Sequence, residues 1–167
     1  AGTVQNAMPF VGVDDRYPKY RSRSGKEDTL AERINGCFQR SMNGRRLSEN
    51  SPEMKAMIAY MEWLSMDVDD GTTIKGIGLT KLDQLVPNIE NGKLLFQVKC
   101  QLCHENDGSG LVAPNGIRIY PPLWGENAYN VGAGMARLNT AAAFIKWNMP
   151  FGQGGSLSDQ EAYDIAA

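Results

Sequence analysis

The chain has 167 residues, 42% of them hydrophobic, which is enough for one larger domain or for two small ones. Its formal net charge of −2 argues against a nucleic acid as the main partner. No apolar run of the sequence approaches the length needed to span a membrane, and the first residues read as an ordinary polar stretch rather than as a signal peptide.

Residues 1–24 show no sustained periodicity and are predicted to form an extended, partly ordered loop. Four cations fall within eight residues of this loop: Arg16, Lys19, Arg21 and Arg23. Such a cluster could bind an anion, or it could simply be solvated.

Residues 29–42 are predicted to form a helix, with Thr29 as its N-cap and Glu32 completing a capping box. Asn43 and Gly44 are expected to end it. The residues that share one face at helical spacing are Leu30, Ile34, Cys37, Phe38 and Ser41.

Cys37 lies in the middle of this face, four residues after Arg33 and four before Ser41. It is the cysteine left over from the three in the chain once the pair at positions 100 and 103 is set aside. From the residues alone, Cys37 is interpreted as a buried structural thiol.

The clearest helix is predicted to begin at Ser51-Pro52, with serine as N-cap and proline in the first turn. Its apolar stripe, interpreted as core, consists of Met54, Met57, Ile58, Met61 and Leu64. After it, the glycine-containing segment 68–87 is predicted to be an interdomain linker. The chain is therefore expected to divide into domains at 1–67 and 88–167.

The most specific motif of the chain is Cys100-Gln101-Leu102-Cys103-His104, which follows a helix predicted over residues 88–101. Cys-x-x-Cys-His attaches c-type haem: the two thiols form thioethers with the haem vinyl groups, and His104 binds the iron. The cations of residues 16–23 could then hold a haem propionate. Zinc would need two further ligands, with Cys37 the only other thiol or imidazole, and a thioredoxin-like site would need a βαβ pattern that is not visible.

The rest of the chain is predicted to enclose this haem. Residues 105–110 form a turn, Tyr120-Pro121-Pro122-Leu123-Trp124-Gly125 suits a porphyrin face, and residues 140–147 form a short helix. Ser158 and Glu161 are expected to cap a final helix. Met149, in the loop after the short helix, is the preferred distal ligand, with Met135, Lys146 and Cys37 as alternatives. Residues 88–167 are thus expected to be a small all-helical cytochrome c domain.

Several stretches carry a resemblance to a known family: residues 33–44 (RINGCFQRSMNG), Ser51-Pro52-Glu53-Met54, residues 100–104, 121–125 and 132–135, and Phe144-Ile145-Lys146 with Asn148-Met149-Pro150. Over nearly its whole length the chain resembles the dihaem thiosulfate dehydrogenases and, more distantly, the SoxA-type cytochromes of sulfur oxidation. The resemblance implies an all-α fold with two cytochrome c-like domains.

The resemblance also implies roles for particular residues. Cys37 would be the distal thiolate ligand of an active-site haem, flanked by Arg33 and Ser41 as further catalytic residues. His104 and Met149 would bind the iron of a second haem that relays electrons. The family oxidises two thiosulfates to tetrathionate, or runs the reverse reaction, and passes electrons to a cytochrome or another acceptor. Arg45 or Arg46 would assist Arg33 in holding the thiosulfate dianion.

One feature departs from the family pattern: this chain has no first Cys-x-x-Cys-His, and Ala1-Gly2-Thr3 resembles the residues that follow it in the family. We therefore expect one haem c on Cys100 and Cys103, and a second haem c whose attachment motif is absent from a trimmed chain. Since such haem is attached after export, a bacterial periplasm or outer surface is expected. The alternative function is a non-catalytic electron carrier or a cytochrome subunit of a larger redox complex.

Overall fold

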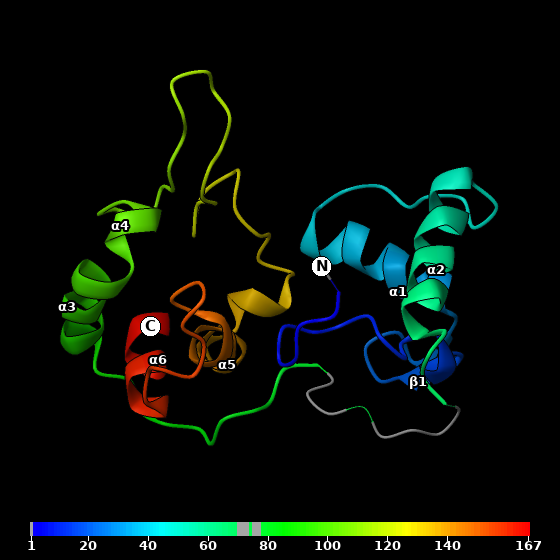
Figure 1. The fold of residues 1–167 in the computed structure, drawn as a ribbon, viewed down its shortest axis with the longest axis horizontal. Coiled ribbons are helices and arrows are strands. Elements are labelled where there is room, and N and C mark those ends of the chain that lie inside the picture. Colours follow the sequence, from blue (N-terminus) through cyan, green and yellow to red (C-terminus); the bar gives the residue numbers. More distant parts are fainter. Residues whose placement is uncertain (1, 70–73, 75–77) are drawn as a thin grey trace. The chain divides into compact units, whose positions relative to one another are not determined.

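The computed structural model describes residues 2–69, 74 and 78–167. They form two compact units, which divide after Gly78, within the segment 68–87 predicted as a linker. Residues 70–73 and 75–77 of that segment lie outside the described residues. Each unit is built mainly from helices, and Figure 1 follows their order along the chain.

The first unit begins with a short 3-10 turn, η1 (Asp14–Arg16), and a two-stranded antiparallel hairpin, β1 (Lys19–Arg21) with β2 (Lys26–Asp28). The sequence predicted only an extended loop up to residue 24, so the hairpin is a correction to that interpretation and a small addition to the all-helical expectation. Strands of three residues are too short to show a period-two pattern. The turn closes where the N–H of Gly25 donates to the Arg21 carbonyl at 2.9 Å.

Helix α1 (Leu30–Gly36) starts with the predicted capping box between Thr29 and Glu32. Its continuation is a π-helical turn, η2 (Cys37–Ser41), in which the N–H of Met42 donates to the Cys37 carbonyl at 3.2 Å. The predicted helix over 29–42 is therefore present, but its last turn is wider than an α-helix. Such wide turns are frequently found at functional sites.

Asn35 is fully buried and attaches the following loop to α1. Its side-chain oxygen accepts from the Leu47 N–H at 2.8 Å, and its amide donates to the Leu47 carbonyl at 3.0 Å. Both polar groups of the side chain are thereby satisfied inside the unit, as burial requires. The sequence did not single out this residue.

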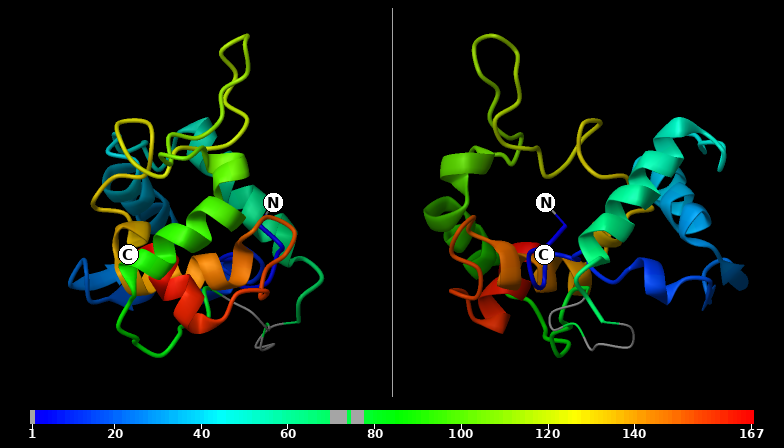
Figure 2. Two further views of the ribbon diagram at one scale, coloured as in Figure 1. Left: turned by 90° about the vertical axis from the view of Figure 1, so that its left-hand side faces the viewer. Right: turned by 45° about the vertical axis from the view of Figure 1, so that its right-hand side comes forward.

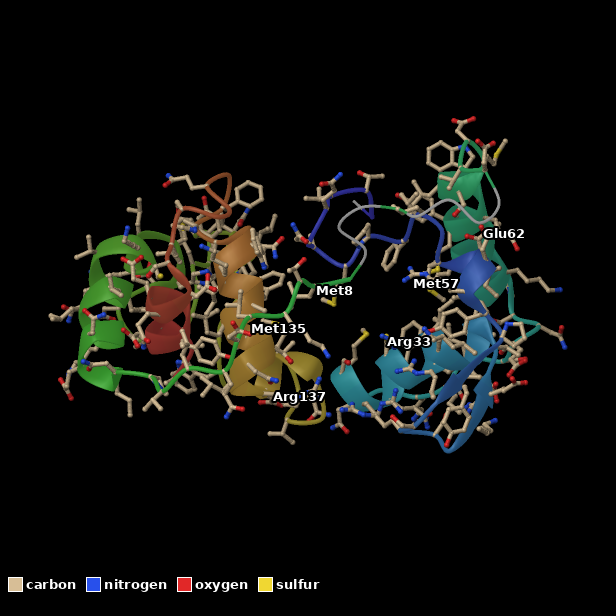
Figure 3. The ribbon with its side chains drawn as sticks, turned by 90° about the horizontal axis from the view of Figure 1, so that it is seen from below. Met8, Arg33, Met57, Glu62, Met135 and Arg137 are labelled. Atoms are coloured by element: carbon tan, nitrogen blue, oxygen red, sulfur yellow. The ribbon has the colours of Figure 1, made fainter. Side chains whose placement is uncertain are left out.

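Helix α2 (Pro52–Ser65) has the predicted Ser51 cap, whose hydroxyl accepts from the Met54 N–H at 3.2 Å. Met54 is completely buried and packs with Ala31 and Ile34 of α1 as the centre of this unit's core. Figure 3 shows Met57 on the same helix. The partly buried side chains around this centre are Leu30, Phe38, Leu47, Met57, Ile58 and Met61.

The second unit contains α3 (Ile89–Lys99), the single turn α4 (Gln101–His104), the 3-10 turn η3 (Gly134–Ala136), α5 (Leu138–Asn148) and α6 (Asp159–Ala166). Helix α3 packs against α6 (Figures 1 and 2), and the buried Gly92 lies at their contact. A Cβ on Gly92 would lie 1.9 Å from the carbonyl oxygen of Asp164, so only glycine permits this approach. The Ser158–Glu161 capping box predicted for the last helix is confirmed.

The buried side chain of Asp164 ties α6 to the start of α3. Its carboxylate accepts from the Asn88 N–H, the Asn91 amide and the Gln160 amide, each at 2.7 Å. Burial opposes ionisation of this carboxyl, but the three hydrogen bonds outweigh it and hold the pKa of Asp164 below its ordinary value.

The apolar core of the second unit consists largely of small residues. Its buried members among the described residues are Ala133, Ala141, Ala142, Ala143, Leu157, Ala162 and Tyr163. In neither unit do the described residues include a helix with the length and apolar character needed to cross a membrane.

Candidate functional site

The haem-attachment motif lies on one helical turn at the end of α3. The N–H groups of Cys103 and His104 donate to the Cys100 carbonyl at 3.1 and 3.0 Å, so both thiols and the imidazole belong to one turn. Both cysteines are free thiols. Burial raises the pKa of the Cys100 thiol, against the opposing effect of the Lys99 charge. Thiols three residues apart on one turn face the same side, as two thioether bonds to one porphyrin require.

The imidazole of His104 has a fixed partner. Its Nδ1 lies 3.1 Å from the carbonyl oxygen of Pro121. Because a carbonyl only accepts, Nδ1 carries the proton and donates it, and this assignment follows from the partner. Nε2 is then left with its lone pair, which is the form of histidine that binds a metal.

The loop after His104 brings Pro121 to this position. Glu105 starts the predicted turn with a φ of +62°, and the N–H of Gly110 donates to the His104 carbonyl at 3.0 Å. Gly110 has a φ of +77°, and a Cβ there would lie 2.6 Å from the Tyr120 and Pro121 backbone. Residues 112–119 then form a loop, and backbone hydrogen bonds between Leu111 and Tyr120 join its two ends.

The second unit leaves several large apolar side chains exposed, and these could pack against a haem. Its core consists mostly of alanines, whereas Trp124 is 61% exposed and Leu102 is 89% exposed. A porphyrin packed against such side chains would complete a core that the chain does not fill by itself. The large apolar residues of this unit that remain exposed include Val98, Leu102, Ile117, Ile119, Trp124, Val131 and Phe151.

The candidates for the distal ligand lie around α5. Met149 is the C-cap of this helix, and Met135 lies in η3 before it (Figure 3). Both side chains are half-buried. The Lys146 amine, by contrast, donates to the Leu157 carbonyl and lies 3.4 Å from an Asp159 carboxylate oxygen. Lys146 is therefore engaged elsewhere, whereas Met149 and Met135 each carry a thioether, a group that can bind haem iron.

Cys37, in the first unit, opens onto a pocket of about 250 Å³. An Arg33 guanidinium nitrogen lies 2.7 Å from its sulfur. The apolar wall of the pocket includes Phe10, Val13, Leu30, Ile34 and Met61. Of the sulfur atoms that line the pocket in the described part of the chain, that of Cys37 is the only thiol, and a thiol beside an apolar wall suits a porphyrin whose iron takes the sulfur as a ligand.

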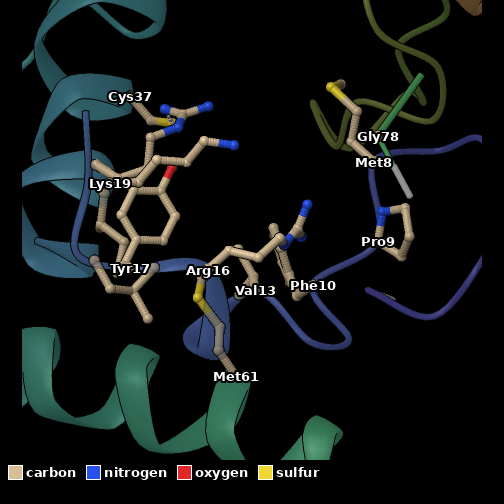
Figure 4. A pocket seen from close by; sticks show the side chains of 13 residues that line it. Met8, Pro9, Phe10, Val13, Arg16, Tyr17, Lys19, Cys37, Met61 and Gly78 are labelled. Carbon is tan, nitrogen blue, oxygen red and sulfur yellow. Dashed lines mark hydrogen bonds between the residues drawn. The ribbon is translucent and has the colours of Figure 1, made fainter. Parts of the chain in front are cut away.

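The pocket also holds two cations that the sequence noted but did not assign to the site. Arg16 and Lys19 direct their charged ends into it, and Met8 lies across from them (Figure 4). The Arg16 Nε donates to the Gly12 carbonyl at 3.0 Å, which fixes that side chain. In the sequence, these two residues belong to the cluster of cations at 16–23. Only the fold shows which cations of that cluster line the pocket of Cys37.

The charged residues that line the pocket, within the described part of the chain, are all cations, so it favours an anion. Ser41 closes η2, and it is not among the described residues that line this pocket. The structure thus joins Arg33 to Cys37 directly and adds Arg16 and Lys19, while Ser41 lies outside this lining.

The alternative of a zinc site receives no support from the arrangement of ligands. Within residues 2–69, 74 and 78–167, no three side chains of histidine, cysteine, aspartate or glutamate converge as a metal site would need.

Comparisons with known proteins match the two halves of the chain to two different family models. Residues 4–69 match the family model "SoxA/TsdA, cytochrome c domain", and residues 87–167 match "Cytochrome C oxidase, cbb3-type, subunit III". The thiosulfate dehydrogenase of Psychrobacter arcticus is 51% identical over 99% of this chain and 51% of its own length. That of Allochromatium vinosum is 48% identical, over 99% of this chain and 62% of its own length.

A solved structure shares the fold. Thiosulfate dehydrogenase (TsdBA) from Marichromatium purpuratum, in its "as isolated" form, superposes with a TM-score of 0.88 at 38% identity. The match covers 99% of this chain and 37% of that one. The chain therefore spans about half the length of the curated relatives it matches, and about a third of the solved one.

The fold, the two matched domains and the attachment turn at Cys100–His104 define a c-type cytochrome made of two cytochrome c domains. A cytochrome of this type binds haem c covalently. Within that class, this chain is a homologue of the thiosulfate dehydrogenases, which confirms the resemblance predicted from its sequence.

Proposed function

We propose that the protein oxidises thiosulfate to tetrathionate, or catalyses the reverse reaction, at the pocket of Cys37. The reaction joins two thiosulfates through a new sulfur–sulfur bond and releases two electrons. The observation that carries the proposal is the contact between Arg33 and the Cys37 sulfur in a pocket whose charged lining is cationic. The names of the homologues support the same chemistry.

The charges of the pocket suit a dianion. Arg33, Arg16 and Lys19 each carry a positive charge, and charge-assisted hydrogen bonds to an oxyanion are the strong ones. Two thiosulfates repel each other, so cations that hold both would favour the coupling of their sulfurs. In this proposal Arg33 also fixes the orientation of the Cys37 sulfur, and Ser41 acts from outside the lining of the pocket.

Two haems would serve this reaction, each accepting one electron when bound. In the first domain Cys37 would supply the distal ligand, and the apolar residues of the pocket would enclose the porphyrin. In the second domain Cys100 and Cys103 would hold the haem, with His104 and Met149 as ligands. The His104 Nδ1 bond to Pro121 would keep Nε2 directed as a ligand.

The electrons would pass from the second domain to a cytochrome or another acceptor. Because haem is attached to Cys-x-x-Cys-His after export, we also propose a periplasmic or extracytoplasmic location. A second candidate function uses the attachment motif at Cys100–His104 alone. With the second-domain haem alone, the protein would be an electron carrier or the cytochrome subunit of a larger complex.

The test uses the full protein loaded with haem in a host that matures c-type cytochromes. Pyridine haemochrome analysis counts the haems per chain, and thiosulfate-dependent reduction of ferricyanide measures turnover. We expect two haems and a turnover that Cys37→Ser abolishes, while Met42→Leu, an exposed change at the end of η2, preserves it. Direct reduction of the second-domain haem by ascorbate should be unchanged in both variants.

Two results would contradict the proposal. One haem per chain, with no thiosulfate-dependent turnover, would support the electron-carrier function instead. Full turnover in Cys37→Ser would place the chemistry elsewhere in the molecule.

A further inference from the structure

Lys146 is an unusually well-anchored lysine. Only 16% of its side chain is exposed. Its amine donates to the main-chain carbonyl of Leu157, lies 3.4 Å from an Asp159 carboxylate oxygen, and lies 5.7 Å from the centre of the Trp147 ring. An ammonium group has three donors and is costly to bury without partners. This cation is thus held by a carbonyl, a carboxylate and an aromatic face.

These partners lie at the far end of the loop that Met149 begins. Leu157 is 2% exposed, and Asp159 is the first residue of α6. The lysine therefore connects the last turns of α5 to the start of α6, across residues 149–157.

The backbone of Lys146 also contacts the loop 149–157. Its carbonyl accepts from the Gly155 N–H at 2.7 Å, and within the loop the Gln153 N–H donates to the Pro150 carbonyl at 2.8 Å. The next residue along α5, Trp147, donates its indole N–H to the Thr80 carbonyl at 3.1 Å. Both the side chain and the main chain of Lys146 thus close one loop against an anchored helix.

We propose that Lys146 is a positioning residue for Met149: by closing the loop 149–157 it keeps the Met149 thioether on the iron of the second-domain haem. This inference rests on the proposed assignment of Met149 as distal ligand. The bond from a thioether to iron is weak, so the ligand stays bound only where the loop that carries it is held. Opening of the loop would expose the iron to small ligands from solution.

The test measures that opening directly, on the full haem-loaded protein. Imidazole added to the oxidised protein displaces the methionine, and loss of the near-infrared methionine-to-iron charge-transfer band follows the reaction at the haem that Met149 would ligate. Lys146→Met keeps the length of the side chain and removes its charge and donors. Since a hydrogen bond to a charged group contributes about 1.5–3 kcal/mol, we expect imidazole to bind about 10- to 100-fold faster.

Three further variants make the result specific. Lys146→Arg retains a cation that can reach the same carbonyl and carboxylate, and should restore most of the slow rate. Asp159→Asn removes one partner and should give an intermediate rate. Lys93→Met, an exposed lysine on α3, should bind imidazole at the unaltered rate.

The outcomes separate this inference from the ligand assignment. If Lys146→Met lowers the unfolding temperature but leaves the imidazole rate unchanged, the residue is merely structural and the proposal is overturned. An unchanged rate with unchanged stability overturns it equally. If Met149→Ala leaves the charge-transfer band intact, the assignment of Met149 has failed, independently of what Lys146 does to the loop.

Discussion

Arg33 and Cys37 are joined twice in this structure. The Cys37 N–H donates to the Arg33 carbonyl, and the Arg33 guanidinium lies 2.7 Å from the Cys37 sulfur. The first contact belongs to the helix, whereas the second depends on the arginine side chain alone. The wide turn η2 begins at the same cysteine, so the sulfur is displayed where the regular helix ends.

Replacement of Arg33 by methionine should therefore impair turnover more than folding. The variant keeps an apolar stem on α1 but loses the donor to the sulfur and one of the three cations of the pocket. Losing a hydrogen bond to a charged group costs about 1.5–3 kcal/mol, so we expect thiosulfate-dependent ferricyanide reduction to fall about 10- to 100-fold. Lys55→Met, an exposed change on α2 outside the pocket, is the control. An equal loss in that control would show that the fall reflects the net charge of the protein rather than the pocket.

Replacement of Met149 by alanine should lower the reduction potential of the second-domain haem. A methionine ligand raises this potential relative to water or a harder donor in its place. Potentiometric titration followed in the visible spectrum measures the change, and Met135→Ala serves as the matched control. The reverse pattern, in which only the Met135 variant shifts, would assign the ligand to η3.

Gly92→Ala should destabilise the second unit, although alanine favours a helix by about 1 kcal/mol over glycine. The added methyl group would meet the Asp164 carbonyl and force α3 and α6 apart. Overpacking of this kind costs about 1–3 kcal/mol or more, so the net free energy of unfolding should fall. Chemical denaturation followed by circular dichroism tests this, with Lys93→Ala on the same helix as control. A variant more stable than the parent would show that the crossing is looser than described.

Asp164 should make the second unit sensitive to acid. Its folded-state pKa lies below the ordinary value of 3.8, so the ionised form favours the fold. That contribution is fully present above the ordinary value and is lost as the pH falls through the folded pKa. Asp164→Asn should lower stability at neutral pH by about 1–3 kcal/mol, since an amide cannot accept all three hydrogen bonds.

The Asn variant should also lose less stability than the parent on acidification below pH 3.8. Urea denaturation at a series of pH values measures both effects, with the exposed Asp83→Asn as control. Parallel pH profiles for parent and Asp164→Asn would contradict the role given to these hydrogen bonds.

Local signals in the sequence predicted the boundaries of most helices. The capping boxes at Thr29 and Ser158, and the serine–proline start at Ser51, are each formed as expected. These signals work because the cap, its partner and the first turn are neighbours in the chain. The haem-attachment motif could also be predicted from local sequence, because its two cysteines and its histidine lie within five residues.

The features that escaped prediction depend on distant partners. Gly92 reads as a weak point in a helix until Asp164 is known to lie against it. Asn35 reads as an ordinary polar residue until Leu47 is found beside it. The widening of the helix at Cys37 leaves no mark in the spacing of apolar residues.

The apolar positions of α3 show a further limit. Ile89, Leu94 and Val98 are large apolar residues of this helix, yet all three side chains are mostly exposed. Instead, Gly92 is the buried contact point of α3 with α6. A small residue contributes nothing to a hydrophobic pattern, so a contact made by the backbone is invisible to it.

The partner of His104 is a main-chain carbonyl rather than a side chain. A carbonyl does not titrate, so the acceptor of this hydrogen bond is the same in acid and in alkaline conditions, unlike an aspartate or a second histidine. Nor can a substitution at position 121 delete the acceptor, since every amino acid carries one. The acceptor that orients the imidazole is thereby insulated both from pH and from most point mutations.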